Sequence, residues 1–212
     1  MIPTLKGESL NIFFHLMDGR MLKRAWIWLR RIKYCRGFGV QSPTDDRFIR
    51  YVINEHWPYY KYETLKKDIR GVNSDTRRLC RLYFRIANHC QAEQFIDIAS
   101  DTTAYEEYVK AGCRKTKTVR INLTDAFDTK KRVIIARIDA GSVTSEMLEK
   151  LIAVAEEGSV VILQGIYDSK EARQTWQEAI GHERAGVTYD LYYCGLLLCA
   201  RRQFKKHYKV NF

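Results

Sequence analysis

The sequence predicts an α/β fold, in which three layers surround a mostly parallel sheet and a basic helical region precedes them. From Gln94 onward, short apolar segments of strand length alternate with segments of helical period. This alternation is typical of a parallel sheet with helices on both faces. The last two apolar segments lie close enough to form an antiparallel hairpin. Before residue 73 the pattern is helical, which divides the chain into a region at 1–72 and an α/β domain at 73–212.

Length and composition favour a folded protein of one large domain, or of one domain with an appendage. The chain has 212 residues, of which 46% are hydrophobic and 12% aromatic, enough to bury a core. No apolar run reaches the ~18 residues that span a bilayer, and the first ten residues lack the layout of a secretory signal. The six cysteines show no metal-ligand spacing, so we expect reduced thiols, no zinc site and a cytoplasmic location. They are Cys35, Cys80, Cys90, Cys113, Cys194 and Cys199.

The charge is unevenly distributed along the chain. Residues 1–90 hold 18 Lys and Arg against 8 Asp and Glu, whereas residues 91–200 hold 13 against 17. The last twelve residues add five basic side chains, which gives a net charge of +11. Basic ends of this kind fit a nucleic-acid or anionic-membrane surface, or solvated helix faces. We place solvated faces first, because no nucleic-acid-binding motif accompanies the charge.

Two segments near the start, Ser9–Met17 and Leu22–Ile32, have helical character. In the second, one apolar stripe lies opposite four basic residues. Such a helix could lie on a membrane surface, or pack its stripe on the domain or on a second subunit, which is commoner. These helices and the exposed aromatics lead us to predict a homodimer. The stripe consists of Leu22, Ala25, Trp26 and Leu29.

Three further helices are expected before the sheet. Ser42 and Pro43 are a helix cap and a first helical residue, and this helix should run to about Asn54. After an aromatic loop at 57–62, Glu63–Arg70 forms a short helix. Asn73–Asp75 offers caps for a helix over Thr76–Cys90, whose four arginines form a charged outer face by default, although two of them could contact phosphates. The arginines are Arg77, Arg78, Arg81 and Arg85, and the two are Arg81 and Arg85.

The α/β domain then alternates strands and helices. Val160–Leu163 is wholly apolar, which predicts a central strand. Asp168 is expected to cap the last helix, with Glu171 completing a capping box. The predicted strands are Phe95–Ile98, Val119–Leu123, Arg132–Ile138, Val160–Leu163, Val187–Tyr192 and Gly195–Ala200, and the helices are Thr103–Lys110, Ser145–Ala155 (capped by Thr144) and Ser169–Ile180.

Ligands of such sheets bind beyond the carboxyl ends of the strands, where the strand order reverses. Glycines in the turn after the first strand let the backbone approach the ligand, and the next helix presents free N–H groups. Here that turn runs from Asp97 to Thr103 and contains no glycine. It reads Asp97-Ile98-Ala99-Ser100-Asp101-Thr102-Thr103.

Several short segments outside this turn resemble one protein family. They are Gly37-Phe38-Gly39-Val40-Gln41-Ser42-Pro43, Pro58-Tyr59-Tyr60-Lys61-Tyr62, Leu82-Tyr83-Phe84-Arg85-Ile86-Ala87-Asn88, Asp190-Leu191-Tyr192-Tyr193-Cys194-Gly195 and Lys206-His207-Tyr208-Lys209-Val210-Asn211-Phe212. From about Arg36 to Phe212 the chain resembles bacterial class I S-adenosylmethionine-dependent methyltransferases of the O-methyltransferase-like kind, particularly a set seen in Bacteroidetes. The resemblance implies a Rossmann-like methyltransferase fold and S-adenosylmethionine as cofactor.

The residues that the resemblance would assign to the cofactor depart from the family's pattern. Asp97 keeps the acidic position of the first motif, but Ala99 and Thr103 stand in place of its glycines. Thr103 adds a branched side chain where the methionine part of the cofactor would pass, and Asp101 adds a carboxylate. Asn122 replaces the carboxylate that would hold the ribose. The candidate cofactor-binding positions, as remnants of a site, are Asp97, Ala99, Ser100, Asp101, Thr103, Asn122 and Asp139.

Two further departures concern the sheet and the metal. Only eight residues, Thr124–Lys131, separate the second strand from the third, where the family fits a helix, a strand and a loop; connections this short are turns. Either the strand pairing differs or the sheet has lost a unit. Asp139 matches a catalytic metal ligand of the relatives, or is a turn residue before Gly141. Gln164-Gly165 replaces the expected acidic pair, so we expect no metal.

Three functions are compatible with these features. The first is an inactive methyltransferase-like protein with a filled pocket, acting through an interface. The second is a methyltransferase with an atypical cofactor site, and the third is a module that binds RNA or anionic lipid. We rank them in that order; no catalytic residue and no methyl acceptor can be named from the sequence.

Overall fold

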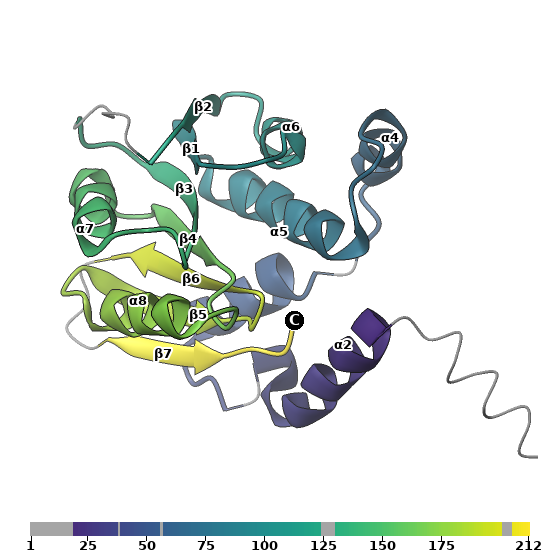
Figure 1. The fold of residues 1–212 in the computed structure, drawn as a ribbon, viewed down its shortest axis with the longest axis horizontal. Helices are drawn as coiled ribbons and strands as arrows, with labels where there is room; N and C mark the ends of the chain where they lie inside the picture. Colours follow the sequence, from purple (N-terminus) through teal and green to yellow (C-terminus); the bar gives the residue numbers. More distant parts are fainter. Residues whose placement is uncertain (1–18, 38, 56, 124–129, 201–204) are drawn as a thin grey trace, which may run out of the picture.

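The computed structural model describes residues 19–37, 39–55, 57–123, 130–200 and 205–212. Within them, helices and strands alternate as the sequence predicts (Figure 1). The helices in chain order are α2 (Gly19–Arg30), the 3-10 helix η1 (Ile32–Gly37), α3 (Pro43–Phe48), the π-helix η2 (Ile49–Ile53), α4 (Tyr60–Asp68), α5 (Ser74–Cys90), α6 (Ala104–Gly112), α7 (Ser145–Val154) and α8 (Lys170–Gly181).

The strands of the described residues form one sheet in the order β2-β1-β3-β4-β6-β5-β7. Neighbouring strands from β2 to β4 are parallel, whereas β6 runs antiparallel to both β4 and β5. This confirms the three-layer Rossmann-like α/β fold with an antiparallel C-terminal hairpin. The strands are β1 (Gln94–Ile98), β2 (Lys117–Ile121), β3 (Ile134–Asp139), β4 (Val160–Gln164), β5 (Ala185–Asp190), β6 (Cys194–Cys199) and β7 (Lys206–Lys209).

Strand β2 lies at one edge of the sheet, and the chain then passes β1 to form β3 on its other side. Of the eight residues expected to join the two strands, 124–129 lie outside the described residues, and no described strand lies beyond β2. The second alternative from the sequence, a sheet that is one unit shorter, therefore fits the described part of the chain. At the opposite edge, β7 pairs parallel with β5. The sequence analysis did not predict β7.

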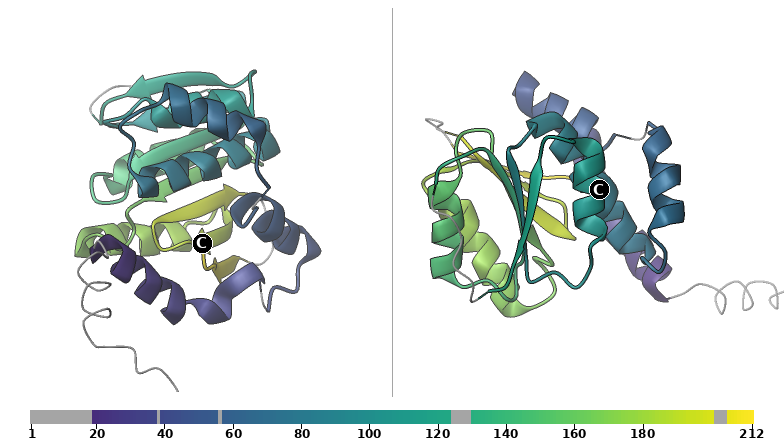
Figure 2. Two further views of the ribbon diagram at one scale, coloured as in Figure 1. Left: turned by 90° about the vertical axis from the view of Figure 1, so that its right-hand side faces the viewer. Right: turned by 90° about the horizontal axis from the view of Figure 1, so that it is seen from above.

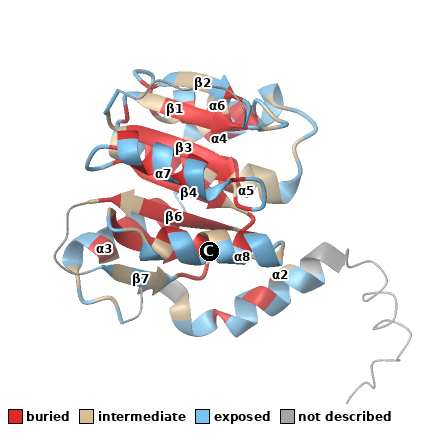
Figure 3. Ribbon diagram, turned by 60° about the vertical axis from the view of Figure 1, so that its left-hand side comes forward, coloured by how far each residue is buried: buried red, intermediate tan, exposed pale blue. Residues whose placement is uncertain are grey.

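Two apolar cores lie on the two faces of the sheet (Figure 2). One face is covered by α5 and α6, and the other by α7 and α8. The central strands are buried on both sides (Figure 3), which explains why β4 is a continuous apolar run. The first core also contains Phe48, Ile49, Val52 and Ile53, so α3 and η2 share the core of the α/β layers.

Side-chain caps explain where four of the helices begin. The side chains of Ser42, Asn73 and Thr144 accept hydrogen bonds from backbone N–H groups of α3, α5 and α7, as predicted. The prediction for α8 is wrong, because Ser169 caps it by accepting from the N–H of Ala172 at 3.0 Å. Asp168 lies one residue too early to reach that N–H, and its own N–H donates to the carbonyl of Gly165.

Helix α2 does not pack its predicted apolar stripe on the domain. Ile27 is the buried contact, at 8% exposure, whereas Trp26 is 62% and Leu29 57% exposed. Directly after the helix, the Arg31 side chain anchors it by donating to the Asp190 carboxylate and to the carbonyl of Val210. The stripe therefore faces outward, which leaves the second subunit and the membrane surface as its predicted partners.

Two other sequence-based assignments need adjustment or cannot be compared. Helix α4 begins at Tyr60, three residues before the predicted start, so part of the aromatic segment is helical. The predicted helix at Ser9–Met17 lies outside the described residues. Within the described ranges, none of the helices combines the length and apolar character needed to cross a membrane.

Candidate functional site

Three polar side chains lie beneath α5 and α6 at the carboxyl ends of the central strands. Asp97 on β1, Arg137 on β3 and Gln164 on β4 occupy positions that alternate with residues of the opposite core, and this places all three on one face. Asp97 and Arg137 are register partners across β1 and β3. This is the place where ligands of open α/β sheets bind.

These side chains form one connected, buried network. The Arg137 guanidinium lies 3.6 Å from the Asp97 carboxylate and donates to the Gln164 amide oxygen at 3.0 Å. It also donates to the carbonyl of Ile98 and lies over the ring of Tyr105, 5.1 Å from its centre. Gln164 in turn donates to the Tyr105 hydroxyl and accepts from the Tyr83 hydroxyl. This part of the space between the sheet and its covering helices is thus filled by side chains, which come from β1, β3, β4, α5 and α6.

The carboxylate of Asp97 is the fully buried anion of the network. The residue is 0% exposed, and its carboxylate forms ion pairs with Arg137 and Arg120 without a hydrogen bond to either guanidinium group. Burial raises its pKa to about 6, against the lowering effect of Arg137. Arg120, at 4.0 Å, is the second cation that faces it. Asp97 is therefore held by charge attraction to two guanidinium groups.

The turn after β1 keeps a glycine-like backbone without a glycine. Ala99 has a φ of 50°, in the left-handed region that favours glycine. Its N–H donates to the carbonyl of Ile121, while Ser100 and Thr102 bond to each other. The Thr102 hydroxyl accepts from the N–H of Ala104 at 3.1 Å, so an early N–H group of α6 is bound within the turn.

Of the remaining predicted positions, Ser100 acts on the network, because its hydroxyl lowers the pKa of Asp97. Ala99, Asp101, Thr103 and Asn122 are exposed, and Ser100 is half-buried. Thr103 precedes α6 without a side-chain cap bond. Asp139 accepts from the N–H of Gly141 at 3.0 Å, as the turn-residue alternative predicted. No group of three or more His, Cys, Asp or Glu suited to a metal ion occurs in the part of the chain that the structure describes.

The sequence pointed to Asp97 but missed Arg137, Tyr83 and Tyr105. A signal for Arg137 is present in the sequence: it is a charged residue inside a mostly apolar strand, and it is the fourth residue of β3 as Asp97 is the fourth residue of β1. No protein-family model matches the chain, and no curated protein matches its sequence.

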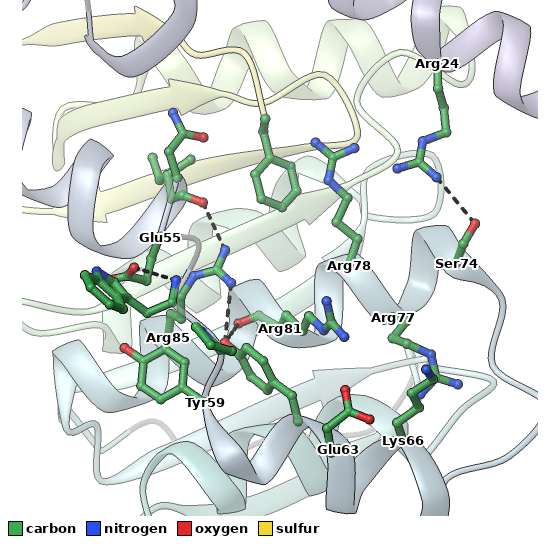
Figure 4. A pocket seen from close by; sticks show the side chains of 16 residues that line it. Arg24, Glu55, Tyr59, Glu63, Lys66, Ser74, Arg77, Arg78, Arg81 and Arg85 are labelled. Atoms are coloured by element: carbon green, nitrogen blue, oxygen red, sulfur yellow. Dashed lines mark hydrogen bonds between the residues drawn. The ribbon is translucent and has the colours of Figure 1, made fainter.

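A second site lies on the other side of α5, and we call it the arginine pocket. It is a cavity of about 740 Å³ lined by residues of α5, α4 and α2 and of the segments at 53–55 and 57–59 (Figure 4), and Phe212 also lines it. Six basic and two acidic side chains line it. The prediction that the α5 arginines form a charged outer face is wrong, because none of the four is exposed and they line a pocket together with residues of α2 and α4. The basic residues are Arg24, Lys66, Arg77, Arg78, Arg81 and Arg85, and the acidic ones are Glu55 and Glu63.

The arginines of this pocket differ in how many of their guanidinium N–H groups form hydrogen bonds. Arg85 is only 7% exposed, and it donates to the carbonyls of Val52 and Ile53 and to the Tyr62 hydroxyl. It therefore ties α5 to the end of η2. Arg81 lies over the Tyr62 ring at 5.1 Å, and its Nε has no hydrogen-bond partner.

Two further arginines of α5 lie toward the start of the helix. Arg77 donates to the carbonyls of Ile69 and Val72, while its Nη1 is buried without a partner. Arg78 stacks on the Phe212 ring at 4.3 Å. Across the pocket, Arg24 of α2 pairs with Asp75 at 3.3 Å.

Proposed function

We propose that this protein is a non-catalytic, methyltransferase-like binding protein, in which side chains occupy the place of the cofactor. The observation that carries the proposal is the buried network of Asp97, Arg137 and Gln164 at the carboxyl edge of the sheet. An active methyltransferase with an atypical cofactor site is the alternative.

The residues present do not fit S-adenosylmethionine. To enter beside Asp97, the cofactor would have to displace the Arg137 guanidinium from a carboxylate that is fully buried. Breaking a buried ion pair by removing one partner costs about 3–5 kcal/mol. The ribose would find Asn122 instead of a carboxylate, and the N–H of Ala104 is already bound to Thr102. What remains of a cofactor turn is the backbone shape at Ala99.

The rest of the molecule supports a role in binding. It offers a lined cavity on the far side of α5 and an exposed apolar stripe on α2. Both could serve a ligand or a partner without any reaction at the sheet edge. A cytoplasmic location belongs to this proposal, and five of the six cysteines are free thiols in the described chain.

Thermal unfolding with and without S-adenosylmethionine tests the proposal. A ligand that binds the native state raises its melting temperature by mass action, so we expect no rise for the wild type at millimolar cofactor. The variant Asp97→Asn locates any effect that does occur. A rise that disappears in Asp97→Asn would overturn the proposal, whereas a rise that survives there and disappears in Arg81→Gln would assign the cofactor to the arginine pocket.

A further inference from the structure

We propose that the arginine pocket binds a small organic phosphate of the nucleotide class, with Arg78 and Arg81 as its phosphate-binding residues. The inference concerns a different site from the one above, because no residue of the Asp97 network lines this pocket. It holds whether or not the protein binds S-adenosylmethionine.

The first argument is an excess of positive charge with little internal compensation. The cavity has six basic and two acidic lining residues. One of the acidic side chains, Glu55, already accepts from the N–H of Trp57 at 2.9 Å. Asp75 pairs with Arg24 and attracts Arg78. The buried Nε of Arg81, in contrast, has no hydrogen-bond partner among the described residues. The guanidinium groups of Arg78 and Arg81 lie over aromatic rings.

The second argument is the repulsion among the positive charges of the pocket. Arg77, Arg81 and Arg85 follow one another at intervals of four on α5, and like charges at this spacing destabilise a helix. Burial and the neighbouring Arg24 both lower the pKa of Arg78. A bound anion would remove this repulsion and supply acceptors to the unpaired donors.

The third argument concerns the kind of anion. Guanidinium groups match phosphate and carboxylate oxygens with paired donors. Several of them around one cavity favour an anion that carries more than one charge, which is the case for a phosphate or diphosphate. Arg85 is not among the binding groups, because its donors are used by Val52, Ile53 and Tyr62. It is a positioning residue that holds α5 against η2.

The fourth argument concerns the organic part of the ligand. Aromatic side chains line the same cavity, among them Trp57 and Tyr59. Trp57 is 71% exposed, so its ring is free to stack on a planar group. A volume of about 740 Å³ lies within the range of small-molecule pockets. A concave site of this size favours a small molecule over a nucleic-acid strand, which would need a continuous basic surface.

Calorimetric titration of the full chain with pyrophosphate, adenosine diphosphate and adenosine tests the inference. We expect adenosine diphosphate to bind more tightly than pyrophosphate, and adenosine alone not to bind. Arg78→Gln and Arg81→Gln should each weaken diphosphate binding at least tenfold. The matched control is Arg173→Gln, which removes the same charge from a helix arginine that also lies over a tyrosine ring, on the other face of the sheet.

Each contrary outcome overturns a defined part of the inference. Absence of pyrophosphate binding, or an equal loss in Arg173→Gln, would overturn the phosphate site. Adenosine diphosphate binding no tighter than pyrophosphate, and insensitive to Trp57→Leu, would overturn the nucleotide class. A further contrary result is that the protein binds single-stranded RNA but not pyrophosphate, with Arg81→Gln leaving RNA binding unchanged. This result would overturn the inference and assign the role of the positive charge to another surface.

Discussion

Asp97 and Arg137 form the buried ion pair on which the proposed loss of a cofactor site depends. Asp97 stands at the acidic position that the resemblance implies, and the turn after β1 has a left-handed residue at Ala99. The arginine of the adjacent strand then takes the place beside the carboxylate. A buried charge needs such a partner, because an isolated carboxylate in the interior is strongly unfavourable.

The protonation of Asp97 makes the stability of the fold depend on pH. Its pKa is raised from 3.8 to about 6 in the folded state, so the folded protein binds this proton more tightly than the unfolded chain does. The stabilising contribution of the proton is full below about pH 4 and is lost as the pH rises through 6. For a shift of roughly two units, the loss is about 2–3 kcal/mol.

Urea unfolding of the wild type and Asp97→Asn at several pH values measures this contribution. We expect the wild type to lose stability relative to Asp97→Asn between pH 4 and 7. The control is Asp101→Asn, an exposed carboxylate in the same turn, for which no such relative change is expected. A constant difference between wild type and Asp97→Asn across this range would contradict the raised pKa.

At this scale the sequence predicted part of the site. The resemblance singled out Asp97 as a candidate position, and turn chemistry predicted the role of Asp139 before Gly141. The sequence did not predict that Arg137 would pair with Asp97, because the pairing depends on which strands are neighbours. Strand order is a property of the sheet and is not written in either strand.

Helix α5 separates the two sites, and its neighbours decide what each face does. Tyr83 points to the network at the sheet, while Arg81 and Arg78 line the pocket. The period of the helix and its cap at Asn73 were predictable from the sequence. The role of its arginines was not predictable, because the pocket that they line also needs residues of α2 and α4. The sequence of a short basic helix does not indicate which other helices it lies beside.

Close packing of α5 on α6 offers a test at the scale of these elements. A Cβ atom added at Gly112, the last residue of α6, would meet the backbone carbonyl of Phe84 on α5. Because backbone atoms cannot move aside cheaply, Gly112→Ala should destabilise the protein by about 1–3 kcal/mol. Chemical denaturation measures the change in the free energy of unfolding.

The matched control is Gly181→Ala, at the corresponding last position of α8. No atom lies within 4 Å of a Cβ added there. Replacing this helical glycine should leave the stability unchanged or raise it by up to about 1 kcal/mol. Equal effects of the two substitutions would show that α5 and α6 do not pack at the described distance.

In the whole molecule, a mostly parallel sheet and the helices on one of its faces form two separate sites, the buried Asp97 network and the arginine pocket. The alternation of strands and helices predicted this architecture, because each buried strand and amphipathic helix has its own period. The sequence did not predict β7, since four residues of alternating exposure are too short to distinguish from a loop. Nor did it fix whether the short connection after β2 changes the strand pairing or shortens the sheet.

The predicted homodimer can be tested on α2. Its exposed apolar stripe includes Trp26 and Leu29, and burial of apolar area between two subunits would stabilise their association. We expect a dimer by light scattering at micromolar concentration, and a monomer for Leu29→Glu. The control Lys23→Glu changes the charge on the same helix outside the stripe. A monomeric wild type at this concentration would contradict the prediction.

Calorimetric titration of S-adenosylmethionine into the wild-type protein tests the central claim most directly. The account predicts no heat of binding, because Arg137 and Gln164 occupy the place beside Asp97 at the carboxyl edge of the sheet. A dissociation constant in the micromolar range that is lost in Asp97→Asn would contradict it.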